Sequence, residues 1–195
     1  EGAGTVESIG PGVEGFSLGD RVAWASVPGS YATHTVVPID KVVKVPDGVS
    51  SQDAAAAMLQ GMTAQYLLCQ TTKVGPGDTI LFHAAAGGVG LIACQWAKHL
   101  GATVIGTAGS DDKVALAKAH GCDHVINYAK EDFVARVREL TGGKGVRVVY
   151  DSVGQATFLR SLDCLVPRGL MVSFGQSSGP APAIEPVLLS TKGSL

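Results

Sequence analysis

From Thr79 onward, short apolar runs alternate regularly with helix-favouring stretches. The connections between successive runs are short, and such crossovers are right-handed, so the pattern predicts an α/β fold whose parallel sheet has helices on both faces. The runs contain few polar residues, which is typical of strands buried on both faces. The expected strands are 79–83, 103–107, 123–126, 146–151 and 169–174, and the expected helices are 88–100, 111–119, 131–141 and 154–163. A sixth strand is expected to begin near Leu195.

Residues 1–50 follow another pattern, in which short strand-like segments end at glycine and proline turns. This spacing predicts a small antiparallel sheet or barrel. The expected strands are 5–9, 21–24, 31–37 and 41–45. The chain begins on a strand-like segment at Glu1, without an initiator methionine, so we expect it to be a fragment of a longer protein.

A helical bridge is expected to connect the two regions. Ser50 followed by Asp53 resembles a capping box, because side-chain oxygens at these positions can accept hydrogen bonds from the free N–H groups of a first helical turn. The helix-favouring residues 54–59 follow, and a second helical stretch is expected from Gly61 to about residue 70. We therefore expect a β-rich domain over 1–60 and a doubly wound domain over 61–195, with its last strand truncated.

The charge balance limits the partners of the chain. Its 195 residues include 15 Lys and Arg against 17 Asp and Glu, which gives a formal net charge of −2. This argues against nucleic acid or an anionic membrane as the main partner. No apolar run approaches the ~20 residues that span a bilayer. The four cysteines form no CxxC pair, so we expect a soluble cytoplasmic protein with buried thiols, without disulfides or a structural zinc site.

The segment from Ile80 to Gly90 is the most informative for function. A predicted strand leads into the small-residue turn Ala84-Ala85-Ala86-Gly87-Gly88-Val89-Gly90, and a helix opens at once with Leu91-Ile92-Ala93. Small residues permit a tight turn, close approach of the backbone to a pyrophosphate, and close packing of helix on strand. The free N–H groups of the helix N-terminus would face the phosphates. At the first strand–helix junction of a doubly wound region, this predicts a dinucleotide site.

The end of the second predicted strand bears on the choice of dinucleotide. NAD sites usually have an acidic residue there for the ribose 2′-hydroxyl, whereas this strand ends in Ala108-Gly109-Ser110. Ser110 and Lys113 could hold a 2′-phosphate at the start of the next helix, so NADPH is favoured. In the alternative interpretation, Ser110 only caps the helix and Lys113 is a solvated charge. The neighbouring Asp111 and Asp112, which would repel a phosphate, favour that alternative.

Two other glycine patterns resemble a P-loop and a hydrolase motif, but their surroundings argue against both. The segment 142–145 lacks the Ser or Thr of a P-loop and follows a helix. The segment Gly175-Gln176-Ser177-Ser178-Gly179 fits the hydrolase pattern G-x-S-x-G, but prolines follow where a nucleophile elbow requires a helix.

His34, His83 and Tyr31 are each more typical of structural side chains than of proton donors. The catalytic residues are therefore left unassigned.

Several motifs together resemble one family. They are Ala84-Ala85-Ala86-Gly87-Gly88-Val89-Gly90 with Gln95-Trp96-Ala97-Lys98, then Gly19-Asp20-Arg21-Val22, Tyr150-Asp151-Ser152-Val153-Gly154 and Pro167-Arg168-Gly169. The chain resembles the quinone oxidoreductase, or zeta-crystallin-like, branch of the medium-chain dehydrogenases/reductases over essentially its whole length. The resemblance implies the latter part of a GroES-like catalytic domain over 1–60, followed by a Rossmann NADP-binding domain.

The resemblance also implies positions for the cofactor. Ser110, Lys113 and Tyr128 match the positions around the adenosine 2′-phosphate, while Gly109 offers no hydroxyl where relatives often have a second serine. The positions implied for the pyrophosphate are Gly88 and Val89, within the glycine turn that also holds Gly87 and Gly90. The positions implied for the ribose and nicotinamide are Thr63, Tyr66, Val153, Phe174, Gly175, Gln176, Ser177 and Ser178.

The implied activity is hydride transfer from NADPH to a quinone without a metal. Zinc-dependent relatives carry a cysteine-rich lobe after the Gly-Asp-Arg-Val motif and a cysteine near residue 60, whereas neither 23–31 nor 59–61 contains cysteine. A homodimer is implied as well. Two alternatives stay open: an NADPH-dependent enone or enoyl-thioester reductase on the same fold, and a non-catalytic NADPH-binding or structural protein.

Overall fold

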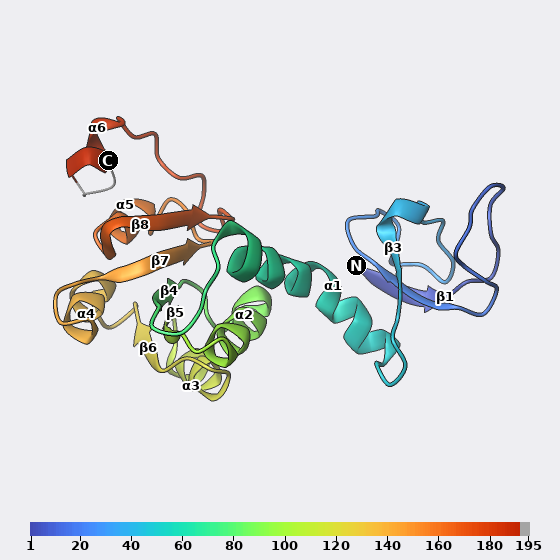
Figure 1. Ribbon diagram of the computed structural model, residues 1–195, viewed down its shortest axis with the longest axis horizontal. Coiled ribbons are helices and arrows are strands. Elements are labelled where there is room, and N and C mark those ends of the chain that lie inside the picture. Colours follow the sequence, from blue (N-terminus) through green and yellow to red (C-terminus); the bar gives the residue numbers. More distant parts are fainter. Residues whose placement is uncertain (192–195) are drawn as a thin grey trace. The chain divides into compact units, whose positions relative to one another are not determined.

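A five-stranded parallel sheet forms the centre of the larger part of the computed structural model, which describes residues 1–191 (Figure 1). The strands lie in the order β6-β5-β4-β7-β8. Their bounds are β4 Thr79–Phe82, β5 Thr103–Ala108, β6 His124–Asn127, β7 Val146–Asp151 and β8 Leu165–Ser173. Because β4 comes first in the chain, this is the Rossmann order 3-2-1-4-5, which confirms the predicted fold class.

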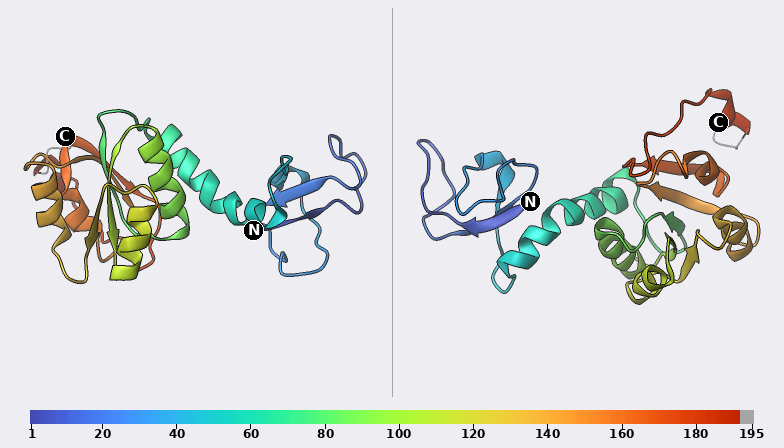
Figure 2. Two further views of the ribbon diagram at one scale, coloured as in Figure 1. Left: turned by 90° about the horizontal axis from the view of Figure 1, so that it is seen from below. Right: turned by 180° about the vertical axis from the view of Figure 1, so that it is seen from behind.

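Helices cover both faces of this sheet (Figure 2). One face packs against α2 Gly88–His99 and α3 Asp111–Ala119, in a cluster that includes Ala93 and Ala117. The other face packs against α4 Phe133–Leu140 and α5 Phe158–Leu162, in a cluster that includes Val137 and Leu162. Burial on both faces is why the strands read as continuous apolar runs.

Element boundaries differ from the sequence expectation most in α4, α5 and β8. Helix α4 begins at Phe133 rather than at 131, because Asp132 is its N-cap and accepts hydrogen bonds from the N–H groups of Val134 and Ala135. Helix α5 is much shorter than the expected 154–163, and β8 is longer than the expected 169–174. The expected sixth strand near Leu195 lies outside the described residues.

Backbone contacts divide the chain into two compact units, Glu1–Thr63 and Ala64–Leu195. The first unit contains a three-stranded antiparallel sheet of β1 Gly2–Thr5, β2 Arg21–Trp24 and β3 Val42–Lys44, with the 3-10 turn η1 Ile39–Lys41 before β3. The strand expected at 5–9 lies earlier, at β1. The strand expected at 31–37 is wrong: residues 31–34 form bends, 35–37 form no regular element, and Tyr31 and Val36 are almost fully exposed.

Helix α1, Ser51–Tyr66, begins with the expected cap, since the N–H of Asp53 donates to Oγ of Ser50 over 3.0 Å. The expected interruption at Gly61 is wrong, because the helix continues through it. Glycine costs a helix only about 1 kcal/mol relative to alanine, and the run of alanines before Gly61 favours the helix. A π-helical turn, η2 Leu67–Thr71, follows and buries Leu67 and Leu68 completely.

No helix within residues 1–191 combines the length and the apolar character needed to cross a membrane.

Candidate functional site

The turns after the five parallel strands all lie at one edge of the sheet, because parallel strands end at the same edge. Helices of opposite faces follow β4 and β7, which are neighbours in the sheet. In open α/β sheets, ligands bind at such a reversal of strand order, outside the carboxyl ends of the strands. This edge carries most of the residues that the sequence predicted as cofactor-binding.

The turn from β4 into α2 is tight and has the expected shape. Ala84 adopts a positive φ of 53°, and the N–H of Gly87 donates to the carbonyl of Ala84 over 2.8 Å. Gly87 is the N-cap of α2, and no side chain within the described residues caps the helix there. The first N–H groups of the helix, from Gly88 and Val89 onward, are therefore directed at the end of the sheet without a side-chain acceptor. A phosphate would satisfy them.

Gly90 lets the helix approach the turn. A Cβ on Gly90 would lie 2.6 Å from the carbonyl oxygens of both Ala84 and Ala85, closer than a real Cβ can come to backbone atoms. The glycine is therefore required by packing of α2 on the turn, one of the three functions of glycine in a dinucleotide-binding turn.

The turn from β5 into α3 holds the residues predicted for the 2′-phosphate. Ser110 is the N-cap of α3, and its Oγ accepts a long 3.4 Å hydrogen bond from the N–H of Lys113. Tyr128 is about half exposed and follows β6, whose last residue pairs with the last residue of β5. A Cβ on Gly109 would lie 2.5 Å from the Tyr128 hydroxyl, so a serine at position 109 would require the half-exposed Tyr128 side chain to shift.

The turns after β7 and β8 are bound to each other. The N–H of Ser177 donates to the carbonyl of Ser152 over 3.1 Å, and the N–H of Ser178 donates to the carbonyl of Val153 over 2.9 Å. The Ser178 hydroxyl also donates to that carbonyl, over 2.8 Å. Gly175 packs against the backbone of Ser152 so closely that a Cβ would lie 2.8 Å from the Ser152 carbonyl. The two turns are therefore joined through their backbones. The Phe174 ring lies tilted against the ring of Phe82, with 5.8 Å between ring centroids.

The same geometry decides against a hydrolase. Ser177 lies in a turn, and the next helix, α6 Val187–Thr191, begins ten positions later. A nucleophile elbow requires a helix directly after the serine. Gly175 to Ser178 are thus available for cofactor contacts rather than for ester cleavage.

The buried carboxylate of Asp151 binds the backbone of the turn after β7. The sequence did not predict this role. Oδ1 of Asp151 accepts hydrogen bonds from the N–H groups of Val153 and Gly154 at 2.7 and 3.0 Å. Its Oδ2 accepts from the hydroxyls of Thr157 and Ser161 at 2.7 and 3.2 Å. Asp151 is fully buried. The signal that could have revealed it is an acidic residue at the end of a buried apolar strand, where burial without partners is costly.

His83 extends this network across the sheet. Its Nε2 lies 2.9 Å from Oγ of Ser161, and its Nδ1 lies 3.0 Å from Oγ1 of Thr107. The Ser161 hydroxyl donates to Asp151, so it accepts from the Nε2–H of a neutral imidazole, and Nδ1 accepts from the Thr107 hydroxyl. Burial lowers the pKa of His83 from 6.5 to about 4, although the Asp151 charge opposes that shift. The geometry matches the predicted structural role of His83.

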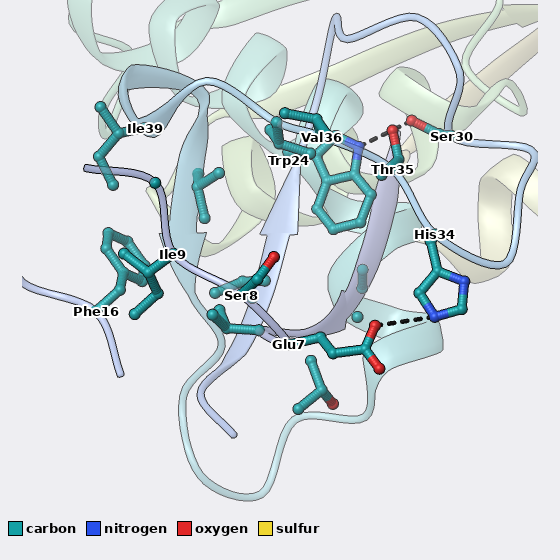
Figure 3. Close-up of a pocket in the computed structure, with 18 of the residues that line it drawn as sticks. Glu7, Ser8, Ile9, Phe16, Trp24, Ser30, His34, Thr35, Val36 and Ile39 are labelled. Carbon is teal, nitrogen blue, oxygen red and sulfur yellow. Dashed lines mark hydrogen bonds and ion pairs between the residues drawn. The ribbon is translucent and has the colours of Figure 1, made fainter. Parts of the chain in front are cut away.

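Thr63 and Tyr66 lie one turn apart on α1. Thr63 belongs to the first compact unit and Tyr66, which is exposed, to the second. The first unit contains a hollow of about 510 Å³ between β1 and the segment 30–39 (Figure 3). At its rim Nε2 of His34 lies 2.9 Å from the Glu7 carboxylate, and Trp24 donates from Nε1 to Oγ of Ser30 over 2.8 Å. None of the predicted cofactor residues lines this hollow.

No group of three or more His, Cys, Asp or Glu side chains within residues 1–191 is arranged to hold a metal ion. All four cysteines are free thiols, and three of them are buried. Burial raises the pKa of Cys164 to about 12, so this thiol stays protonated at neutral pH.

Two family models match the chain. The model of the zinc-binding dehydrogenases matches residues 88–194, and that of the alcohol dehydrogenase GroES-like domain matches residues 1–47. The first of these covers more than half of the chain.

Curated relatives extend the match to the whole chain. A quinone oxidoreductase of Pseudomonas aeruginosa is 55% identical, and a 2-haloacrylate reductase of a Burkholderia species is 52% identical. Each match covers 100% of this chain and 60% of the relative, so the chain spans about three fifths of their length. The expected resemblance to quinone oxidoreductases is confirmed.

Among solved structures, quinone oxidoreductase of Escherichia coli complexed with NADPH superposes with a TM-score of 0.94 at 53% identity. That match covers 99% of this chain and 60% of the other. A CurK enoyl reductase superposes with a TM-score of 0.85 at 33% identity, covering 97% of this chain and 56% of the other.

Proposed function

This chain belongs to the zinc-binding dehydrogenase family. We propose that it binds NADPH and is part of a quinone oxidoreductase, which passes hydride from NADPH to a quinone. The observation that carries the proposal is the uncapped turn from β4 into α2, whose Gly90 permits close approach of helix and turn. It occurs in a chain 53% identical to a relative whose structure is described as complexed with NADPH.

We assign the parts of the cofactor to the turns of the sheet edge. Gly87, Gly88, Val89 and Gly90 would face the pyrophosphate with backbone N–H groups. Ser110, Lys113 and Tyr128 would surround the 2′-phosphate. The remaining proposed contacts, toward the ribose and nicotinamide, are Thr63, Tyr66, Val153, Phe174, Gly175, Gln176, Ser177 and Ser178. In this assignment residues 61–195 form the NADP-binding domain, and 1–60 form part of the GroES-like catalytic domain.

The protein's contribution to the chemistry is orientation. NADPH supplies a hydride from the nicotinamide ring, and a quinone accepts it through its conjugated carbonyls. The paired turns after β7 and β8 are fixed to each other by backbone hydrogen bonds, and Asp151 holds the first of them. Turns fixed in this way would keep a bound nicotinamide in one position relative to the acceptor. No group of three or more His, Cys, Asp or Glu side chains within residues 1–191 fits a zinc ion, so no step is assigned to one.

A second candidate activity is reduction of an activated carbon–carbon double bond. It is favoured by the 52% identity to a 2-haloacrylate reductase and by the structural match to an enoyl reductase. Steady-state assays of the full-length protein with quinones and with enones, at equal NADPH, would separate the two candidates. NADPH binding without turnover of either class would instead indicate a non-catalytic protein.

We also propose that the protein is a cytoplasmic homodimer. Sedimentation analysis of the full-length protein would test its oligomeric state.

The test of the nucleotide site is Lys113→Ala. Loss of one ammonium beside the 2′-phosphate should weaken NADPH by roughly tenfold and NADH by less than about twofold. Calorimetric titration with each dinucleotide measures the two dissociation constants. Lys118→Ala is the matched control, because Lys118 is exposed in the last turn of the same helix. Equal losses for both dinucleotides would contradict the assigned role of Lys113.

A further inference from the structure

Asp111 presents an electrostatic problem for the proposed site. It is the first residue of α3, directly after Ser110, and its side chain is 71% exposed. A free carboxylate there would repel the 2′-phosphate that Ser110 and Lys113 are proposed to hold. In the sequence, Asp111 and Asp112 together favoured the alternative in which Ser110 only caps the helix and Lys113 is a solvated charge.

The structure gives this carboxylate two partners, one at the end of β6 and one in the turn that follows it. Its Oδ2 lies 2.6 Å from Nζ of Lys130, and its Oδ1 accepts a hydrogen bond from Nδ2 of Asn127 over 2.8 Å. Asn127 is buried at the end of β6. These two contacts hold the pKa of Asp111 below its usual value, so the group is ionised and its charge is matched by Lys130.

The same two residues frame Tyr128. The N–H of Lys130 donates to the carbonyl of Asn127 over 2.9 Å, which folds the segment 127–130 into a turn. The N–H of Tyr128 donates to the carbonyl of Ala108 over 3.1 Å, and its hydroxyl lies against Gly109. The ion pair and the Asn127–Asp111 hydrogen bond thus connect this turn, which carries Tyr128, to the start of α3.

We propose that Lys130 is a specificity-determining residue for the 2′-phosphate, acting through Asp111 by neutralising its charge and by holding the Tyr128 turn against α3. Lys130 is a positioning residue in this scheme and need not touch the cofactor. The inference rests on the proposed function, since it concerns the selectivity of the same site for NADPH over NADH.

The experiment compares dissociation constants of NADPH and NADH for three variants and the wild-type chain. Lys130→Gln leaves the Asp111 charge unmatched, so it should weaken NADPH by roughly three- to tenfold and NADH by less than about twofold. The double variant Lys130→Gln with Asp111→Asn removes both charges and should restore NADPH affinity to within about twofold of wild type. A merely structural role of Lys130 would not produce this recovery.

Lys98→Gln is the matched control. Lys98 forms an exposed ion pair with Asp123, which precedes β6 at its other end, so this variant should leave both affinities unchanged. Lys130→Gln with an unchanged ratio of the two affinities, or a double variant that does not recover, would overturn the inference while wild-type selectivity for NADPH stands. A wild-type chain that binds neither dinucleotide would overturn the proposed function, and this inference with it.

Discussion

The two compact units differ sharply in how much of their sheet is buried. In the second unit, strands β4 and β7 lie at the centre of a sheet with helices on both faces, and Ile80, Leu81 and Val149 are completely buried. In the first unit the described core is smaller: Ala23, Val45 and Ala54 form one cluster with a few partly buried neighbours, and Val22, Trp24 and Ala25 are also buried. Since the free energy gained on folding scales with the apolar area removed from water, most of the stability of this 195-residue chain is expected to reside in the second unit.

The difference also teaches where function is placed. The buried strands of the second unit form a rigid base, and the residues proposed to contact the cofactor lie mainly in the turns at its edge. Loops held by a rigid scaffold are where binding residues concentrate. The first unit instead carries exposed apolar side chains such as Tyr31 and Val36.

The largest expected effect comes from truncating the central strand. Leu81→Ala should lower the free energy of unfolding of the second unit by about 3–4 kcal/mol, because the buried side chain leaves a cavity that a close-packed sheet cannot fill. Urea unfolding followed by the fluorescence of Trp96 in a Trp24→Phe background measures this, since the chain has only 2 tryptophans, one in each unit.

Val43→Ala in β3 is the corresponding change in the first unit. Val43 is 47% exposed, so its truncation should cost less than about 1 kcal/mol, read from Trp24 in a Trp96→Phe background. Equal costs for the two substitutions would show that the contrast in burial does not translate into a contrast in stability.

The second expected effect is a dependence of stability on pH. The pKa of buried His83 is about 4, below its value of 6.5 in the unfolded chain. Between these two values the unfolded state binds a proton that the folded state does not, so stability is full above pH 6.5 and falls as the pH is lowered toward 4. The loss should amount to roughly 3 kcal/mol.

Replacing the imidazole by a group that does not titrate tests this. His83→Gln should flatten the slope of unfolding free energy against pH between 6.5 and 4, whatever its effect at neutral pH. His34→Gln is the control in the first unit, because His34 is exposed and paired only with exposed side chains. If this slope is unchanged in His83→Gln, groups other than His83 cause the loss of stability at acid pH.

The sequence predicted most of the second unit because its signals are local. Apolar runs define the strands, and a small-residue turn between strand and helix defines the candidate site. The buried network could not be predicted in the same way, since His83 and Ser161 are 78 positions apart in the chain. The Lys130–Asp111 ion pair could not be predicted for the same reason, since its residues are 19 positions apart in the chain. Asp111 was therefore interpreted as a charge that would repel a phosphate.

The errors in the first unit have a different cause. The segment 31–37 has the composition of a strand, yet strand propensity depends on packing against neighbours, and Tyr31 and Val36 pack against almost nothing in the described structure. Gly61 was expected to end a helix, but a single glycine is outweighed by the alanines before it. Composition alone therefore misplaces elements where few buried contacts reinforce it.

The smallest expected effect concerns a single hydrogen bond in the first unit. Nε1 of Trp24 donates to Oγ of Ser30 over 2.8 Å, and the Ser30 hydroxyl donates onward to the carbonyl of Val27 over 3.1 Å. Ser30→Ala leaves the indole N–H without this acceptor, at a cost of about 1 kcal/mol because the bond is only partly buried. Unfolding followed by Trp24 fluorescence in the Trp96→Phe background measures the loss.

Ser8→Ala controls for removal of a hydroxyl, since Ser8 is exposed in the same unit, and it should cost less than about 0.5 kcal/mol. The comparison is informative because the first unit has so few buried contacts. If Ser30→Ala cost no more than Ser8→Ala, the segment after β2 would not be held by Trp24 in solution. If it cost several times the expected amount, this one bond would be organising the segment, and the small core would be a poor guide to the stability of the first unit.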